Sequence, residues 1–276
     1  MLSGLSVAPD PLPADFANAF ADVGDRLGGF GGQVLYFSTI GSTNDVAATL
    51  AGLGHERVVV IADAQTQGRG RRGRTWFSPP GAGLYVSTVL VPSRAGDRDR
   101  ATALVTLAVG LALAESVERV TGLGPDIKWP NDLLVGRRKL AGILAEAVAS
   151  TPLHRVEAVV VGYGINVGRA AYPRELDEIA TNLASELGAP VDRAVLCAET
   201  LAAVARRERD LIAGRFDAIL DAWRARAPGH DRARVSWDTP EGRRTGVTAG
   251  VDDMGALRVL VDQRIERLVA GEVHWH

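Results

Sequence analysis

Cysteine is almost absent from this sequence, in which Cys197 is the single one among 276 residues. One thiol excludes an internal disulfide framework and is typical of a protein from a reducing compartment. The N-terminal segment lacks the basic and apolar regions of a signal peptide, and Gly, Glu or Arg interrupts the longest apolar runs before about 18 residues. These shortages predict a soluble, cytoplasmic protein with no membrane partner.

A basic surplus is missing as well, because the net charge is -2 and aromatic residues make up only 5%. Proteins that bind nucleic acid usually carry excess positive charge, so we expect no nucleic-acid partner. Lysine is rare: Lys128 and Lys139 are the two lysines among 31 basic residues. Arginine cannot replace lysine where a compact, titratable charge is needed. The window from 128 to 139 is therefore the first place to look for chemistry.

The pattern of apolar residues and glycines predicts an α+β protein in two parts. A helical and strand-rich unit over 1–225 is followed by short strands over 226–276, with "APGHD" marking the boundary. We expect helices over 14–28, 98–122, 192–209 and 216–226, and one that begins at Ser42 or Thr43; strands over 33–39, 57–64, 83–91 and 155–168; and a hairpin over 126–150 that turns at 135–137.

The stretch "GRGRRGR", residues 68–74, places four arginines and three glycines between a predicted strand and Trp76. Such a tract is often a solvated surface, but its place after a buried strand favours a ligand-binding loop. Glycine lets backbone N–H groups approach an anion, and a guanidinium group binds phosphate or carboxylate through two parallel hydrogen bonds. The spacing of a Walker loop is absent. We expect residues 65–75 to be disordered until an anion binds.

The two lysines lie beside other polar residues. Lys128 begins "KWPND", in which Asn131 and Asp132 follow a strand, and either a salt bridge or a functional role is consistent with it. For Lys139 we favour function, since Gly142 on the same strand leaves room for a ligand against the backbone. An ammonium group there would stabilise charge that develops on an oxyanion or a phosphoryl oxygen.

Five motifs in order resemble biotin protein ligase. They are "GSTN" at 41–44, "AQTQGRGRRGRTW" at 64–76, "KWPNDLL" at 128–134, "KLAGILAE" at 139–146 and "GYGINV" at 162–167, and the likeness extends over about 35–220. Each motif alone is weak, but five in the same order are a specific signal. The resemblance implies an SH2-like mixed sheet of the class II synthetase type, with helices on one face, followed by a small SH3-like barrel.

The same resemblance implies a two-step reaction. Biotin and ATP with Mg²⁺ give biotinyl-5′-AMP and pyrophosphate, and biotin then moves to one lysine of a biotin carboxyl carrier domain of acyl-CoA carboxylase or pyruvate carboxylase. The first unit would be the catalytic domain that binds both substrates. No residue is assigned as a metal ligand.

The resemblance also assigns the site residues. Lys139 and Arg69 would be catalytic. Biotin would contact Ser42, Thr43, Gln65, Gly68, Arg69, Arg71, Lys139 and Gly142, with Leu140 and Leu144 as apolar walls. ATP would contact Arg69, Arg71, Trp76, Asn131, Asp132 and Asn166, although Trp76 is equally consistent with a core indole.

One feature of many bacterial relatives is not expected here. Only about forty residues precede Ser42, too few for an N-terminal winged helix-turn-helix, so we expect a monofunctional type without a repressor role. A lipoate ligase or lipoyl transferase is the nearest alternative. An Arg/Gly-loop RNA-binding module conflicts with the charge, and an adaptor protein leaves both lysines unexplained. The sequence determines neither the oligomeric state nor a general base for the transfer step.

Overall fold

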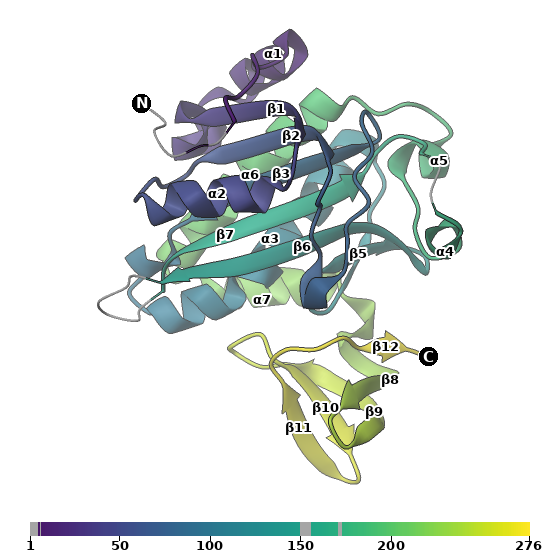
Figure 1. Ribbon diagram of the computed structural model, residues 1–276. Helices are drawn as coiled ribbons and strands as arrows, with labels where there is room; N and C mark the ends of the chain where they lie inside the picture. The colour runs from purple at the N-terminus through teal and green to yellow at the C-terminus, as the bar shows by residue number, and fades with distance from the viewer. Residues whose placement is uncertain (1–4, 6, 150–155, 171–172) are drawn as a thin grey trace.

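The computed structural model describes residues 5, 7–149, 156–170 and 173–276. Its larger unit is built on a seven-stranded sheet in the order β1-β2-β3-β7-β6-β5-β4 (Figure 1). Strands β1 and β2 run parallel, and the other neighbours are antiparallel, so the sheet is mixed. The strands are β1 (Val34–Ile40), β2 (Val59–Gln65), β3 (Gly83–Leu90), β4 (Asp126–Lys128), β5 (Asp132–Val135), β6 (Arg138–Ala149) and β7 (Val156–Asn166).

Helices cover both faces of this sheet, which refines the expectation of helices on one face. The main core lies between the sheet and α1 (Ala14–Val23), α3 (Arg98–Thr121), α6 (Arg193–Ile212) and α7 (Phe216–Ala225). On the other face, α2 (Thr43–Gly52) buries Ala47 and Leu50 against Phe37 and Val60. Of the helices that the structure describes, α2 is the one that packs on that face, so much of the sheet around it is left for a ligand. The expected α+β class is confirmed.

Shorter elements connect these layers. They are the 3-10 helices η1 (Gly24–Gly32), η2 (Arg71–Gly73), η3 (Pro92–Arg94) and η4 (Pro228–His230), and the helices α4 (Arg174–Asp177) and α5 (Leu183–Leu187). The predicted turn of the 126–150 hairpin is confirmed, with Gly136 at a φ of 61° that favours glycine. The "KWPND" segment adds a further short hairpin between β4 and β5.

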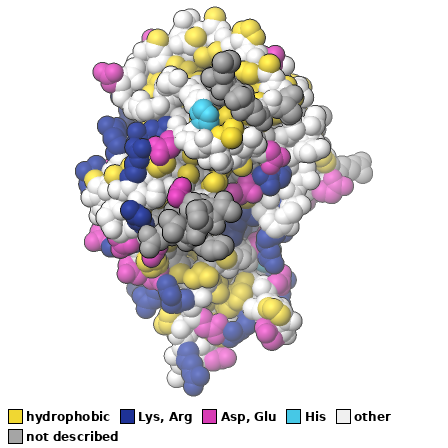
Figure 2. Space-filling model, turned by 60° about the vertical axis from the view of Figure 1, so that its left-hand side comes forward, with side chains coloured by type: hydrophobic (Ala, Val, Ile, Leu, Met, Phe, Trp, Pro, Cys, Tyr) yellow, Lys and Arg dark blue, Asp and Glu magenta, His cyan; other side chains and the backbone are white. Residues whose placement is uncertain are grey.

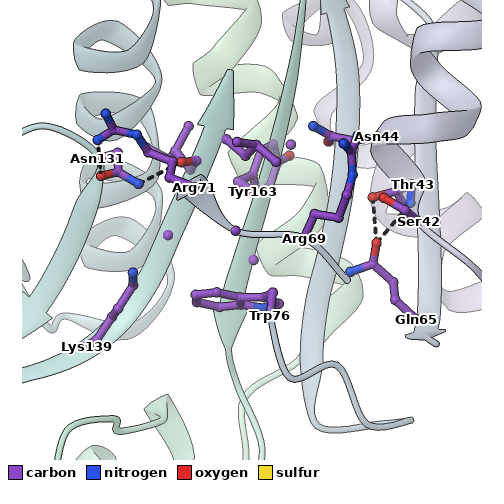
Figure 3. A pocket seen from close by; sticks show the side chains of 16 residues that line it. Ser42, Thr43, Asn44, Gln65, Arg69, Arg71, Trp76, Asn131, Lys139 and Tyr163 are labelled. Atoms are coloured by element: carbon purple, nitrogen blue, oxygen red, sulfur yellow. Dashed lines mark hydrogen bonds between the residues drawn. The ribbon is translucent and has the colours of Figure 1, made fainter. Parts of the chain in front are cut away.

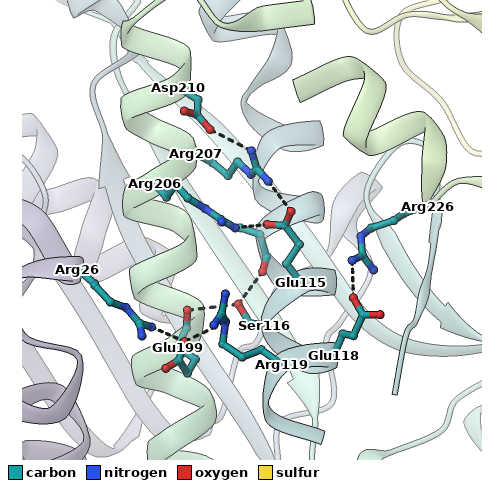
Figure 4. A network of polar contacts seen from close by, with 11 residues as sticks. Arg26, Glu115, Ser116, Glu118, Arg119, Glu199, Arg206, Arg207, Asp210 and Arg226 are labelled. Atoms are coloured by element: carbon teal, nitrogen blue, oxygen red, sulfur yellow. Dashed lines mark hydrogen bonds and ion pairs between the residues drawn. The ribbon is translucent and has the colours of Figure 1, made fainter. Parts of the chain in front are cut away.

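Helix α3 is long and apolar enough to cross a membrane by length and composition, but its apolar residues pack inside this unit. Ion pairs join its outer side to α6 (Figure 4). Glu115 pairs with both Arg206 and Arg207, and Glu199 pairs with Arg119. Helix α3 is therefore a core helix of this fold.

Cys197 on α6 is also fully buried, and burial raises the pKa of its thiol, as expected for a packing residue.

The C-terminal unit is a five-stranded antiparallel sheet in the order β11-β10-β9-β8-β12. Its strands are β8 (Asp231–Thr239), β9 (Gly242–Val251), β10 (Leu257–Val261), β11 (Arg264–Leu268) and β12 (His274–Trp275). The sheet contacts the larger unit at the "KWPND" hairpin, where Trp129 Nε1 donates to the carbonyl of Gly255 at 3.0 Å. The C-terminal unit therefore helps to hold the "KWPND" hairpin of the larger unit in place.

Candidate active site

A cavity opens on the face of the sheet that α2 leaves partly free (Figure 3). The start of α2, the end of β2, the Gly/Arg loop, the turn between β4 and β5, and strands β6 and β7 supply its walls. The lining residues are Ser42, Thr43, Asn44, Gln65, Arg69, Gly70, Arg71, Trp76, Asn131, Lys139, Gly142, Ile143, Leu144, Gly162, Tyr163 and Gly164. The five motifs of the sequence therefore converge on one site.

One end of this cavity is polar and buried. The backbone N–H and the hydroxyl of Thr43 both donate to Gln65 Oε1, at 2.9 and 3.1 Å. Gln65 Nε2 donates to Ser78 Oγ at 3.0 Å, and Ser87 Oγ lies 2.7 Å from Thr43 Oγ1 and 2.6 Å from Asn44 Oδ1. These groups offer both donors and acceptors to a polar ligand head, and Thr43, Asn44 and Ser87 are buried.

The floor of the cavity is made of glycines on β6 and β7. Gly142 and Gly164 are cross-strand neighbours. A Cβ at Gly164 would lie 2.3 Å from Trp76 Nε1, and one at Gly162 would lie 1.9 Å from Asn44 Oδ1. A side chain at either position would force its neighbour to move, because real Cβ contacts are essentially never this short. The glycines let Trp76 and Asn44 lie directly against the sheet.

Trp76 separates the two ends of the site (Figure 3). Its ring lies between the Thr43–Gln65 pair on one side and Lys139 on the other, with Lys139 Nζ 5.4 Å from the ring centroid. The indole Nε1 is buried and has no hydrogen-bond partner among the described residues. A buried donor of this kind is costly unless a ligand or water accepts from it.

A bulge in β6 brings Lys139 and Gly142 to the same face. The pairing of β5 with β6 shifts between Leu133 and Leu134, so strict alternation fails beyond Lys139. Leu140 is consequently fully buried in the main core, and its expected place as a cavity wall is wrong. Leu144 does line the cavity, as expected.

Three of the loop arginines, Arg69, Arg71 and Arg74, have acidic or amide partners. Arg71 Nη1 donates to Asn131 Oδ1 at 3.0 Å, and Arg74 forms a two-bonded pair with Glu272 on the C-terminal unit, at 2.9 and 2.6 Å. Burial lowers the pKa of Arg71 below its usual value. Residues distant in sequence thus supply the loop with polar contacts that its own glycines and arginines do not provide. The expected disorder of residues 65–75 before an anion binds stays a prediction.

A second, larger cavity adjoins the first and shares Gly70, Arg71, Trp76, Asn131 and Lys139 with it. Lys139 Nζ lies 2.6 Å from Asp132 Oδ1, and both side chains line the second cavity. Burial lowers the pKa of Lys128, which also lines this cavity. The two rare lysines therefore reach one space, with Lys139 at its junction with the first cavity.

Nearly all of the predicted site residues meet at these two cavities. Asp132 and Asn166 line the second cavity only, and Asn166 Nδ2 donates to the carbonyl of Thr181 at 2.9 Å. Gly68 lines neither cavity: a Cβ there would lie 2.5 Å from the Trp76 carbonyl oxygen, so it lets the loop fold back. Five further residues near these cavities had no role predicted from the sequence, although all of them lie within the five motifs: Asn44, Glu146, Gly162, Tyr163 and Gly164.

Comparison with known proteins identifies the family of this chain. The model of the biotin/lipoate A/B protein ligase family matches residues 36–166. The chain is 34% identical over 249 residues to the bifunctional ligase/repressor BirA of Bacillus subtilis, covering 88% of this chain and 74% of that protein. It is 35% identical to the biotin--[acetyl-CoA-carboxylase] ligase of Mycobacterium tuberculosis, covering 90% of this chain and 92% of that protein.

The fold has a similar relative among solved structures. The biotin protein ligase from Aquifex aeolicus in complex with biotin and ATP superposes with a TM-score of 0.74 at 26% identity, covering 88% of this chain and 98% of that one. On sequence and fold together, the chain belongs to the biotin/lipoate A/B protein ligase family, among relatives named as biotin protein ligases.

Proposed function

We propose that this protein is an ATP-dependent biotin–protein ligase. It forms biotinyl-5′-AMP and pyrophosphate from biotin and ATP, and then transfers biotin to a lysine of a biotin carboxyl carrier domain. The observation that carries this proposal is the pair of adjoining cavities with Lys139 and Arg71 at their junction. A carboxylate from the first cavity and a phosphate from the second meet beside these two cations.

The first cavity fits the ureido ring of biotin at its polar end. Thr43 and Asn44 are buried there and present hydroxyl and amide groups. A ureido group can donate and accept, whereas the dithiolane ring of lipoate has no strong donor or acceptor. Lipoate would leave buried polar groups unpaired, and a site built for hydrogen bonds rejects such a ligand strongly. This favours biotin over the lipoate alternative.

The adenylation step follows from the placement of the two cations. A carboxylate oxygen of biotin attacks the α-phosphorus of ATP, and the bond from that phosphorus to the pyrophosphate oxygen breaks. Negative charge gathers on the α-phosphoryl oxygens, where Lys139 and Arg71 supply positive charge. Trp76, whose buried Nε1 has no hydrogen-bond partner among the described residues, lines both cavities at the same junction.

Magnesium would enter with ATP. The described residues contain no group of three or more His, Cys, Asp or Glu side chains that could hold a metal alone. Mg²⁺ is commonly held by one or two carboxylates together with substrate phosphates, and Asp132 offers a carboxylate to the second cavity. The residues therefore fit a magnesium ion that arrives with the nucleotide and neutralises phosphate charge.

In the second step the acceptor lysine amine attacks the acyl carbon of biotinyl-AMP, an amide bond forms, and AMP leaves. We propose that the acceptor is a carrier domain of an acyl-CoA carboxylase or pyruvate carboxylase, since the Mycobacterium tuberculosis relative named above is a biotin--[acetyl-CoA-carboxylase] ligase. Reaction with a purified carrier domain, followed by a mass increase of one biotinyl group, tests this partner.

We further propose that this chain does not bind DNA specifically. Before β1, the described residues form α1 and η1, whose apolar side chains are buried in the main core. Basic and acidic side chains are interspersed on the face shown in Figure 2, so that face presents no uniform positive field. A salt-resistant, sequence-specific complex in a gel-shift with biotinyl-AMP would contradict this proposal.

Pyrophosphate release tests the function directly. The 276-residue protein is incubated with ATP and magnesium, with biotin in one reaction and lipoate in another. We expect release with biotin and background with lipoate. Release with lipoate alone would make the protein a lipoate ligase, and release with neither would overturn the adenylation mechanism.

A further inference from the structure

Glu146 joins the polar end of the first cavity to the Gly/Arg loop. Its Oε2 accepts a hydrogen bond from Asn44 Nδ2 at 2.7 Å and another from Arg69 Nη2 at 2.8 Å. Asn44 lies at the start of α2, and Arg69 reaches across from the loop (Figure 3). The same carboxylate therefore contacts two parts of the site that come from different elements.

Glu146 also fixes the direction in which the Asn44 amide faces. The bare Gly162 leaves space for this amide, since a Cβ there would lie 1.9 Å from Asn44 Oδ1. Ser87 Oγ is 2.6 Å from Asn44 Oδ1, and Glu146 can only accept. The amide must then place its oxygen toward Ser87 and its NH₂ group toward Glu146. A run of hydrogen bonds thus connects Ser87, through Asn44, to Glu146 and Arg69.

Arg69 has a second acidic partner, Asp45 on α2, at 2.8 Å. The Asp45 side chain is 58% exposed and the Glu146 side chain is 35% exposed. Exposed pairs contribute little, and Glu146 is better held because it stands on a central strand and is bonded to Asn44. Of the two carboxylates, Glu146 is therefore the one that can position both Asn44 and Arg69.

We infer that Glu146 is a positioning residue of the ligase, one that orients Asn44 for the ligand head and holds Arg69 so that the loop stays closed over the cavity. This inference rests on the proposed function. It extends it by connecting recognition at the polar end to closure of the loop, through a residue with no assigned contact to substrate.

Three variants separate the two contacts. Glu146→Ala removes both. Glu146→Gln keeps an amide oxygen that accepts from Asn44 but loses the charge that pairs with Arg69. Asp45→Asn weakens Arg69 alone. A matched control is Glu56→Gln, because Glu56 pairs with Arg94 at similar exposure away from this site.

Two measurements report on the contacts. The first is the rate of trypsin cleavage after Arg69 in the ligand-free protein, resolved by mass spectrometry, which needs no substrate. The second is KM and kcat for biotin in pyrophosphate release. Glu146→Ala should speed cleavage after Arg69 about fivefold, which corresponds to the loss of an exposed ion pair. It should also raise KM for biotin about tenfold, which corresponds to the loss of a charge-assisted hydrogen bond, with a smaller change in kcat.

Glu146→Gln should speed cleavage in the same way but keep KM within about twofold of the wild type, because Asn44 remains oriented. Asp45→Asn should speed cleavage less, and Glu56→Gln should change neither quantity. Wild-type cleavage in Glu146→Ala would overturn the contact with Arg69. Equal KM increases in the Ala and Gln variants would overturn the positioning of Asn44. If the wild type released no pyrophosphate, the proposed function would fail, while the cleavage rates would still judge the Arg69 contact.

Discussion

Gly164 is the position where one added methyl group should damage the site most directly. In Gly164→Ala the new Cβ would lie 2.3 Å from Trp76 Nε1 and 2.4 Å from Trp76 Cε2. Ordinary carbon contacts begin near 3.4 Å, so the indole must move back by roughly 1 Å. Trp76 is part of both cavities, and its displacement therefore reaches the junction where the reacting groups meet.

The magnitude depends on which part yields. Overpacking costs about 1–3 kcal/mol when the surroundings are rigid. Gly164 stands on a central strand paired on both sides, whereas Trp76 belongs to a loop, so the loop should move. We expect the free energy of unfolding to fall by only about 1 kcal/mol, at the low end of that range. Because a misplacement of about 1 Å can cost up to 100-fold, kcat/KM for biotin should fall at least tenfold.

Urea unfolding and pyrophosphate release, measured on the same preparation, test this expectation. Gly96→Ala is the matched control, since a Cβ at Gly96 meets nothing within 4 Å and its backbone has no positive φ. Its stability should stay within about 0.5 kcal/mol of the wild type and its kcat/KM should not change. A Gly164→Ala protein with wild-type kcat/KM would refute the reasoning that Trp76 lies against this glycine in the working enzyme.

Three further predictions concern the basic residues. Lys139→Ala should abolish adenylate formation, because loss of one stabilising group costs about 3–4 kcal/mol of transition-state energy. Lys139→Arg should restore little of this activity, and the circular dichroism spectra of both variants should match the wild type. Near-normal pyrophosphate release by the arginine variant would contradict this expectation. Burial lowers the pKa of Lys128, so the unfolded chain holds that proton more tightly and wild-type stability should rise with pH up to about 10.5. In Lys128→Met the free energy of unfolding should no longer rise with pH in this way, and at neutral pH it should exceed that of the wild type. Urea unfolding at a series of pH values measures this. The same pH dependence in the variant and the wild type would show that burial of Lys128 is not its cause. Trypsin should cleave residues 68–74 fastest in the free protein, more slowly with biotin and slowest with a non-hydrolysable biotinyl-AMP analogue, and equal rates in all three states would show that the loop does not close on its ligand.

Local sequence determined much of the fold. Apolar alternation, helical periodicity and glycine turns identified the strands of the main sheet, the long helices and the C-terminal strands, since each depends on residues close together in the chain. The rarity of lysine singled out Lys139, and the order of the five motifs identified the family. These features are visible in one dimension because each is a property of a short segment.

Tertiary structure decided what those segments do to one another. Asn44 and Glu146 are 102 residues apart and Arg74 and Glu272 are 198 apart, and no local pattern records that either pair meets. The bulge opposite Leu133 and Leu134 turned Leu140 into the core and brought Lys139 to the face of Gly142. Sequence periodicity assumes regular pairing, whereas the actual register follows from the packing of the whole sheet. For that reason the sequence named the loop arginines, and only the fold supplied the carboxylates that hold them.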